Sequence, residues 1–262
     1  MSRSKRIWLI AAAVLTVLGA ALFIYALIAL GFDMTKLSPV KPVENIYEID
    51  EDFDRIAFEL QTSDVTILPS DDGVCRIECR EADKMRHTAD VEGTFLKIGL
   101  DDTREWYERL LFNPRDIGVT LYVPEEEYAS ISVSVSTGDV TVEPLKVTSG
   151  VKIGCSTGDV HLNDLTCGQL AVDTSTGDVF LNGVAVSGSL TVRCTTGDVW
   201  FDRCDAESIS VGTTTGDVTG TFLTEKIFSV DTSTGDVNVP ESASGGRCDV
   251  STSTGDVNIK IK

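Results

Sequence analysis

The sequence predicts an all-β fold, a single-stack β-solenoid with coils of about 19–20 residues, preceded by one transmembrane α-helix. A motif of the form Ser/Thr-Thr-Gly-Asp-Val occurs seven times between Ser136 and Val257. A fixed period of this size is typical of repeat proteins in which each repeat forms one coil that stacks on the next. The helix is indicated by 26 consecutive residues without formal charge, Ile7–Phe32. The motif glycines are 19 or 20 residues apart, at Gly138, Gly158, Gly177, Gly197, Gly216, Gly235 and Gly255.

The N-terminal run has the length and the flanks of a membrane anchor. A helix rises about 1.5 Å per residue, so Ile7–Phe32 exceeds the roughly 30 Å hydrocarbon core of a bilayer. The run is also longer than the apolar region of a cleaved signal peptide, which has about 7–15 residues. Because basic flanks stay in the cytoplasm, Arg3, Lys5 and Arg6 predict a cytoplasmic tail over residues 1–6. We therefore expect residues 7–32 to be an uncleaved, single-pass signal-anchor in the cell membrane, with the C-terminal domain extracytoplasmic.

The remainder of the chain divides into a linker and a solenoid. Residues 33–48 contain Pro39 and Pro42 and are typical of a stiff polar stalk. Residues 49–262 carry the strand pattern, with irregular coils over 49–130, an insertion at 103–118, and regular coils over 131–262. The last strand, Val257–Lys262, is expected to end the stack, with Lys260 and Lys262 protecting its open edge.

Each regular coil is expected to contain two short strands joined at a corner. The positions seven and five residues before the motif glycine are mostly Val, Ile or Leu, and the position two residues after it is always Val. This alternation of apolar and polar residues predicts strands with one buried face. The alternation changes parity across Gly-Asp, which indicates a bend. Gly supplies a positive φ there, and Asp accepts hydrogen bonds from backbone N–H groups.

The net charge of the chain limits the classes of partner that it can bind. The formal net charge is −19, and a strongly acidic surface repels nucleic acids and anionic lipid headgroups. The sequence contains no phosphate-binding loop, and neither His87 nor His161 follows a recognisable pattern of nucleophilic catalysis. We therefore predict a non-catalytic protein that needs no cofactor and does not bind nucleic acid.

The motif aspartates are candidates for weak binding of divalent cations. Carboxylates stacked about 4.8 Å apart repel one another, and a cation between two of them would relieve this repulsion. Calcium normally takes six to eight oxygen ligands, however, and one carboxylate per coil does not supply a dedicated site. The seven aspartates are Asp139, Asp159, Asp178, Asp198, Asp217, Asp236 and Asp256.

The seven cysteines are expected to be buried free thiols that act as small apolar residues. Cys155 and Cys194 occupy one position of the repeat but lie two coils apart, too far for a disulfide. Cys75 and Cys79 lie on one face of a strand and cannot pair with each other. No zinc-type spacing is present, and His87 is isolated in the sequence, so no metal–thiolate site is predicted.

Two features are candidates for partner binding. The outward position three residues after the motif glycine carries rings in three consecutive coils, His161, Phe180 and Trp200, which predicts an exposed aromatic stripe. Such a stripe either binds a partner or stabilises the sheet through ring stacking. The insertion at 103–118 contains Trp106 and Tyr107 at helix-like spacing, and is either a cap on the solenoid or an arm that contacts a partner or the membrane.

Several stretches together resemble a known family. The segment "FELQTSDVTILPS" at Phe58–Ser70, the segment "GVTLYVPEE" at Gly118–Glu126 and the tandem Thr-Gly-Asp-Val coils are similar to the putative-adhesin (LiaG-like) family of bacterial envelope β-solenoid domains of unknown function. The resemblance covers about residues 46–262. It implies a bacterial envelope protein without established catalytic residues.

We therefore expect a membrane-anchored envelope protein that displays an acidic β-solenoid as a binding or adhesion surface for an envelope protein or a cell-wall glycan. A regulatory partner in envelope-stress sensing, which binds a membrane sensor or a peptide, is the alternative. A structural spacer and a polysaccharide-active enzyme are the other functions considered. The oligomeric state stays open.

Overall fold

The computed structural model describes residues 3–29, 43–82, 84–106 and 117–262. The N-terminal segment forms one apolar helix, α1 (Arg3–Ala29). Within the described residues, no helix meets the combined length and apolarity that a membrane crossing requires. The transmembrane role of residues 7–32 stays a prediction. The β unit of the chain is separate from this helix and is described by itself.

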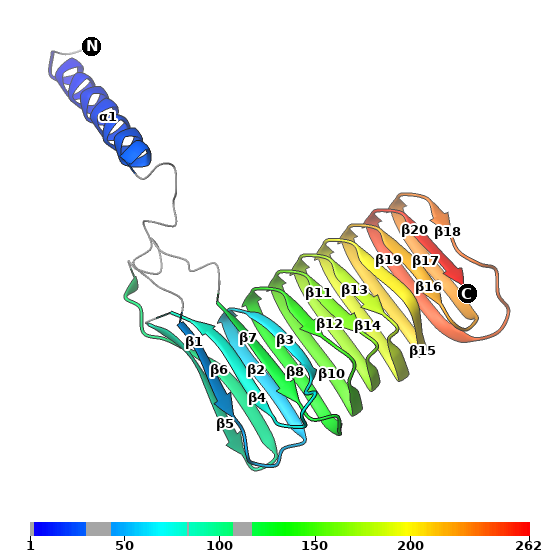
Figure 1. Cartoon of the computed structure of the whole chain (residues 1–262). Coiled ribbons are helices and arrows are strands. Elements are labelled where there is room, and N and C mark those ends of the chain that lie inside the picture. Colours follow the sequence, from blue (N-terminus) through cyan, green and yellow to red (C-terminus); the bar gives the residue numbers. More distant parts are fainter. Residues whose placement is uncertain (1–2, 30–42, 83, 107–116) are drawn as a thin grey trace. The chain divides into compact units, whose positions relative to one another are not determined.

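The β unit consists of two sheets of stacked strands, as predicted for a solenoid (Figure 1). In the regular coils, sheet 1 contains the strands that lead into the Gly-Asp corners, and sheet 2 contains the strands that leave them. In stacking order, sheet 1 is β5 (Met85–Glu92), β6 (Phe95–Asp102), β2 (Arg55–Thr62), β8 (Glu127–Thr137), β10 (Lys146–Thr157), β12 (Thr166–Thr176), β14 (Ala185–Thr196), the second half of β15 (Val199–Thr215), β19 (Gly246–Thr254) and β17 (Lys226–Thr234). Sheet 2 is β1 (Val43–Glu48), β4 (Arg76–Glu81), β7 (Gly118–Val123), β3 (Asp64–Pro69), β9 (Val140–Val142), β11 (Val160–Asn163), β13 (Val179–Asn182), the first half of β15, β16 (Val218–Phe222), β20 (Val257–Ile261) and β18 (Val237–Asn238).

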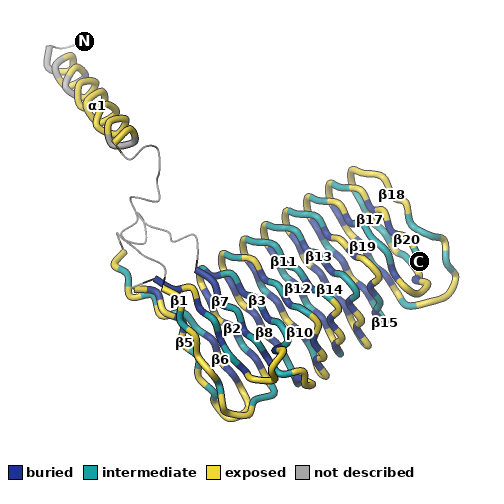
Figure 2. The backbone as a smooth tube through the Cα atoms, in the orientation of Figure 1, coloured by how far each residue is buried: buried dark blue, intermediate teal, exposed yellow. Residues whose placement is uncertain are grey.

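The core lies between the two sheets and consists of the residues that the alternation predicted. In one coil, Leu170 and Val172 of β12 and Val179 and Leu181 of β13 are all buried. Equivalent residues of neighbouring coils continue this core along the stack, which Figure 2 shows as buried backbone running through consecutive strands. Because one face of each short strand is buried and the other is solvated, the period-two pattern was sufficient to identify the inward positions.

The motif glycine is required because successive corners touch. At Gly177, φ is +136°, and a Cβ atom would lie 2.0 Å from the carbonyl oxygen of Gly158 in the coil before it. The N–H of Gly177 in turn donates to the carbonyl of Thr196 in the following coil, at 3.0 Å. The same close approach recurs at the other motif glycines. A side chain at this position would therefore push two coils apart.

The aspartate of the motif connects each corner to the next. Oδ1 of Asp178 accepts a hydrogen bond from the backbone N–H of Asp198 at 2.8 Å. Since this N–H has no partner in a strand ladder, the carboxylate satisfies it. We call this series the aspartate ladder, and its acceptors are Asp64, Asp139, Asp159, Asp178, Asp198, Asp217 and Asp256. The expectation that Asp accepts bonds from backbone N–H groups is confirmed.

The C-terminal end of the stack does not follow the order of the sequence. The final coil, β19 and β20, lies between the coil of β15 and β16 and the coil of β17 and β18. The prediction that Val257–Lys262 forms the open edge is therefore wrong for Val257 and Asn258, which pair with β16 on one side and β18 on the other. Among the described strands, Ile259–Ile261 pair with β16 alone. The outermost coil is β17 with β18, and its Val237 is 48% exposed although the same position is buried in every other regular coil.

A buried ion pair spans the inserted coil. Lys226, 2% exposed, lies on β17, and its Nζ atom is 2.5 Å from Oδ1 of Asp205 on β15. Gly246 of β19 is the residue in register with Lys226, and a Cβ atom there would lie 2.2 Å from the carbonyl oxygen of Glu207. A side chain at Gly246 would therefore clash with the backbone of β15 in the neighbouring coil.

The N-terminal end is also rearranged relative to the sequence. The irregular coil of β2 and β3 stacks directly on the first regular coil, β8 and β9. The strands between them in the sequence, β4 to β7, lie at the end of the stack. Here β4 pairs with β7, and β5 pairs with β6, both in the antiparallel direction. The predicted stalk over residues 33–48 is too long, because Val43–Glu48 pairs with β4 as strand β1.

The close contact at the corner predicts a strong penalty for a side chain there. We expect Gly177→Ala to lower the free energy of unfolding by about 3 kcal/mol or more, because backbone strain adds to the clash with Gly158. Gly212→Ala is the matched control, since no atom lies within 4 Å of its Cβ position, and its effect should stay within about 0.5 kcal/mol. Urea unfolding of the full chain measures both, and equal effects would contradict the role of the corner.

The ladder predicts that an aspartate matters only where another coil follows it. Asp178→Ala leaves the N–H of Asp198 without its acceptor and should cost about 1 kcal/mol. Asp236 lies in the outermost coil, where no N–H of the described residues donates to its carboxylate. Asp236→Ala should therefore change stability by less than about 0.5 kcal/mol. Thermal unfolding at one pH compares the two variants, and a larger loss for Asp236→Ala would refute the ladder.

Candidate functional site

The predicted aromatic stripe forms a stacked ladder on the outer face of sheet 2. His161, Phe180 and Trp200 are in register on β11, β13 and β15. The ring centroids of His161 and Phe180 are 4.7 Å apart with an interplanar angle of 3°, and those of Phe180 and Trp200 are 6.5 Å apart at 29°. We call these three residues the aromatic ladder. The sequence prediction that their rings lie side by side is confirmed.

Ring stacking determines which aromatic surfaces of the ladder are accessible to a partner. His161 and Phe180 turn their ring faces toward each other, and both side chains are half-buried. Trp200 is 48% exposed, because its neighbour in the next coil is Thr219, which carries no ring. The accessible aromatic surface is thus concentrated at Trp200, and the other two rings support it from one side.

Polar groups border the aromatic ladder on both sides. Toward the corner are carboxylates of the aspartate ladder. On the other side, Asn163, Asn182 and Asp202 are in register on the same three strands. Arg203 donates to Oδ1 of Asn182 at 3.0 Å and to Oδ2 of Asp202 at 3.1 Å. The hydrogen bond from Arg203 lowers the pKa of Asp202, so this carboxylate stays charged in moderately acidic solution. A ligand on Trp200 would therefore meet amide and carboxylate groups that form hydrogen bonds.

Weak binding of divalent cations by the motif aspartates stays a prediction. One oxygen of each acceptor carboxylate is used by a backbone N–H group, as described above. Among the described residues, no motif aspartate belongs to a cluster of three metal-ligating side chains. The ladder is therefore explained by its hydrogen bonds within the stack.

Of the two insertion residues, the structure describes only Trp106. Trp106 is 75% exposed and belongs to the unit that is described apart from the β unit. Tyr107 lies outside the described residues. The interpretation of the insertion at 103–118 as a cap or a contact arm stays a prediction.

All seven cysteines are free and buried, and the repeat alignment predicted this for Cys155, Cys167, Cys194 and Cys248. Burial raises the pKa of their thiols, to about 11 for Cys204 and to about 12 for Cys248. A thiol with so high a pKa is protonated at neutral pH and is a poor nucleophile. This environment is typical of cysteines that serve as packing residues.

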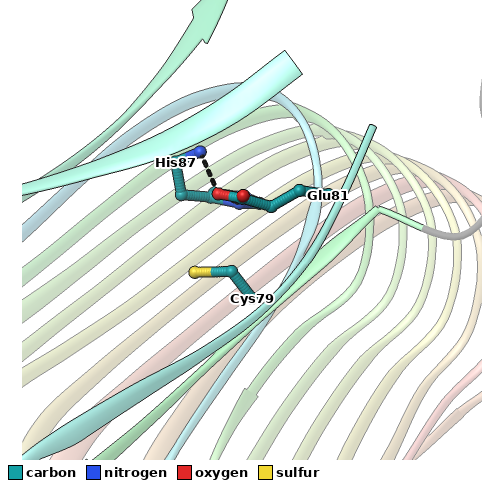
Figure 3. Close-up of side chains that lie close together, drawn as sticks. All are labelled: Cys79, Glu81 and His87. Atoms are coloured by element: carbon teal, nitrogen blue, oxygen red, sulfur yellow. Dashed lines mark hydrogen bonds and ion pairs between the residues drawn. The ribbon is translucent and has the colours of Figure 1, made fainter. Parts of the chain in front are cut away.

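Cys79 differs from the other cysteines because two ligating side chains lie beside it. Cys79, Glu81 and His87 are buried, and one ligand atom from each lies within 4.8 Å of the other two (Figure 3). The interpretation of His87 as isolated is therefore wrong, because the β4–β5 turn folds it back onto β4. The sequence contained one indication that this corner differs from the regular ones, since Ser63 occupies the position of the motif glycine.

Several solved structures are distantly similar to the chain. Solved structures from Bacteroides fragilis, "a putative adhesin", and from Clostridium sporogenes, "a putative cell adhesion protein", are similar at 14% and 12% identity with TM-scores of 0.45 and 0.40. The matches cover 84% and 85% of this chain, and 97% and 100% of those chains. A "putative lipid binding protein" from Parabacteroides distasonis matches at 15% identity with a TM-score of 0.36, over 83% of this chain and 96% of that one.

No curated protein matches the chain. Residues 53–262 match the model of the family described as Toastrack DUF4097. This range contains every regular coil and most of the irregular ones, and the match agrees with the resemblance to a family of unknown function that the motifs indicated. The chain therefore belongs to the Toastrack DUF4097 family.

Proposed function

We propose that the chain is a non-catalytic binding protein of the bacterial envelope, and that Trp200 is the centre of a site for a cell-wall glycan. The observation that carries the proposal is an indole ring, 48% exposed, at the open end of the aromatic ladder. An aromatic face attracts the apolar face of a sugar ring, and the flanking amides and carboxylates supply hydrogen bonds to its hydroxyl groups. The net charge of −19 disfavours acidic glycans and favours neutral or cationic ones.

The rigidity of the support favours binding over a purely structural role for Trp200. Its strand is paired on both sides, by β13 and by β16. Phe180 packs against one side of the indole and limits its rotation. A pre-positioned ring loses little conformational entropy when a ligand binds. Ring stacking that served only the sheet would not require the last ring to be half exposed.

The regulatory alternative follows from the same acidic surface. Carboxylates beside an exposed indole suit a basic peptide segment, through charge and a cation–π contact. Such binding would be much weaker at high ionic strength, whereas stacking on a neutral sugar would not. Salt dependence therefore separates the two functions.

We also propose that residues 7–32 anchor the protein in the membrane and place the β unit outside the cytoplasm. The support is the uncharged run of 26 residues behind Arg3, Lys5 and Arg6. Alkaline extraction of bacterial membranes that contain the full chain should leave it in the pellet, and deletion of residues 1–32 should release it. Full extraction of the intact chain would argue against an anchor.

The binding site can be tested with purified peptidoglycan and the purified full chain. We expect Trp200→Ala to reduce retention at least about tenfold, a loss of about 1.4 kcal/mol, without a change in thermal stability. Phe95→Ala is the matched control, because it removes an exposed aromatic ring on β6 of sheet 1 and should leave retention unchanged. Equal retention by the wild type and by Trp200→Ala would exclude the site. Retention by envelope proteins alone, lost in high salt, would support the regulatory alternative.

A further inference from the structure

A second site, distant in the sequence from the regular repeats, lies at the N-terminal end of the β unit. Cys79 and Glu81 are two residues apart on β4, so both side chains point to the same face of the strand. His87 lies on β5, which follows after a short turn. Ser63 lies at the corner between β2 and β3. Three segments, β4, β5 and the corner between β2 and β3, thus direct these four side chains into one place.

The site is closed to solvent and polar. The exposed fractions of Cys79, Glu81, His87 and Ser63 are 1%, 2%, 6% and 1%. Such a group of polar side chains is costly to bury unless each finds a partner. The ligand atoms of Cys79, Glu81 and His87 lie within 4.8 Å of one another, and Figure 3 shows that all three side chains face a common space.

The hydrogen bonds leave one nitrogen without a partner. The hydroxyl of Ser63 donates to the carbonyl oxygen of Asp64 at 3.2 Å, so it accepts from Nε2 of His87, which is 3.1 Å away. A neutral imidazole that carries its proton on Nε2 has a lone pair on Nδ1. Nδ1 of His87 is buried and has no hydrogen-bond partner. It lies 3.4 Å from Oε1 of Glu81, so a lone pair faces a carboxylate oxygen.

The residues around the cluster hold the candidate ligand atoms in place. Asn45 of β1 donates to Oε2 of Glu81 at 2.5 Å, and the backbone N–H of His87 donates to Oε1 at 2.6 Å. Ser63 fixes the ring of His87 through Nε2. Hydrogen bonds of this type, on the far nitrogen of a histidine and on the carboxylate, orient ligands at metal sites.

We propose that Cys79 Sγ, Glu81 Oε1 and His87 Nδ1 bind one Zn²⁺ ion. Sulfur, imidazole nitrogen and carboxylate oxygen are the ligand atoms that Zn²⁺ takes in proteins. Zinc–ligand bonds of about 2.0–2.3 Å in a tetrahedral arrangement place ligand atoms roughly 3.5 Å apart. Small side-chain rotations would therefore bring these three atoms into range. The fourth position is open for water or another ligand.

The charges balance in this site. Binding displaces the proton of the Cys79 thiol to solvent, and the thiolate, the carboxylate and Zn²⁺ together have no net charge. The ion would also take the position between Nδ1 of His87 and Oε1 of Glu81, where the lone pair and the carboxylate otherwise face each other. A buried neutral centre avoids the cost of an isolated charge.

The position of the site indicates what the metal ion would do. It would join β4 and β5 to each other and, through Ser63, to the first corner of the stack. These strands lie where the regular coils end and where the hairpin β5–β6 and the strand β1 close the core. Asn45 belongs to β1, which pairs with β4 alone among the described strands, so local opening of this edge strand gives the ion a path to Glu81.

The proposal is tested with Co²⁺ and Zn²⁺ on the metal-free full chain. Co²⁺ should give a thiolate-to-metal absorption band with a stoichiometry of one, and Zn²⁺ should displace it. We expect Cys79→Ala to abolish the band and to weaken Zn²⁺ binding at least tenfold, as measured against a chromophoric chelator. Cys75→Ala, another buried cysteine near β4, should keep both. Ser63→Ala should keep the band and weaken binding about tenfold.

Folding is monitored by circular dichroism, and Glu81→Gln serves as a second ligand variant if Cys79→Ala does not fold. In the folded wild type, Zn²⁺ at about a hundredfold excess over Kd should raise the thermal midpoint by at least about 3 °C. Absence of a thiolate band in the folded wild type would overturn the proposal. An unchanged band in Cys79→Ala, or its loss in Cys75→Ala, would also overturn the assignment of the ligands.

Discussion

The close approach of successive Gly-Asp corners is the constraint on which the rest of the β unit depends. No motif glycine has space for a Cβ atom, since the carbonyl oxygen of the corresponding residue in a neighbouring coil lies about 2 Å from where that atom would be. Each motif aspartate that has a further coil stacked beyond it uses one carboxylate oxygen to accept a hydrogen bond from the backbone N–H of the aspartate in that coil. The corner therefore sets the spacing and the register of both sheets together, and seven repeats of one motif produce one rigid stack.

This constraint frees the outward positions for other roles. Because the corner and the inward apolar residues hold each coil, the residue three positions after the glycine can vary without disturbing the stack. It is Thr, His, Phe, Trp or Asn in different coils. Three rings in consecutive coils produce the aromatic ladder, and the change from Trp200 to Thr219 leaves one indole accessible. A binding surface can thus be built or altered on this fold one coil at a time.

The buried polar cluster lies beside the corner that lacks the motif glycine. Ser63 takes the position of the motif glycine, and its side chain meets His87 in the space where the regular coils have a carbonyl oxygen. The antiparallel strands β4 and β5 replace a regular coil at this end. The opposite end is different, with β17 and β18 partly exposed and Lys226 bonded across one coil to Asp205. The two ends of the stack are therefore closed by unrelated means.

The sequence by itself determined the coil period, the inward residues, the corner, the buried thiols and the alignment of His161, Phe180 and Trp200, because all of these follow from local periodicity. Only the tertiary structure decided the order of the last three coils and the meeting of Ser63, Cys79, Glu81 and His87. Every regular coil presents the same hydrogen-bonding edge, so the repeat does not specify which coil stacks on which. The cluster depends on antiparallel returns that bring unequal, non-repeated segments together, and a period in the sequence carries no information about them.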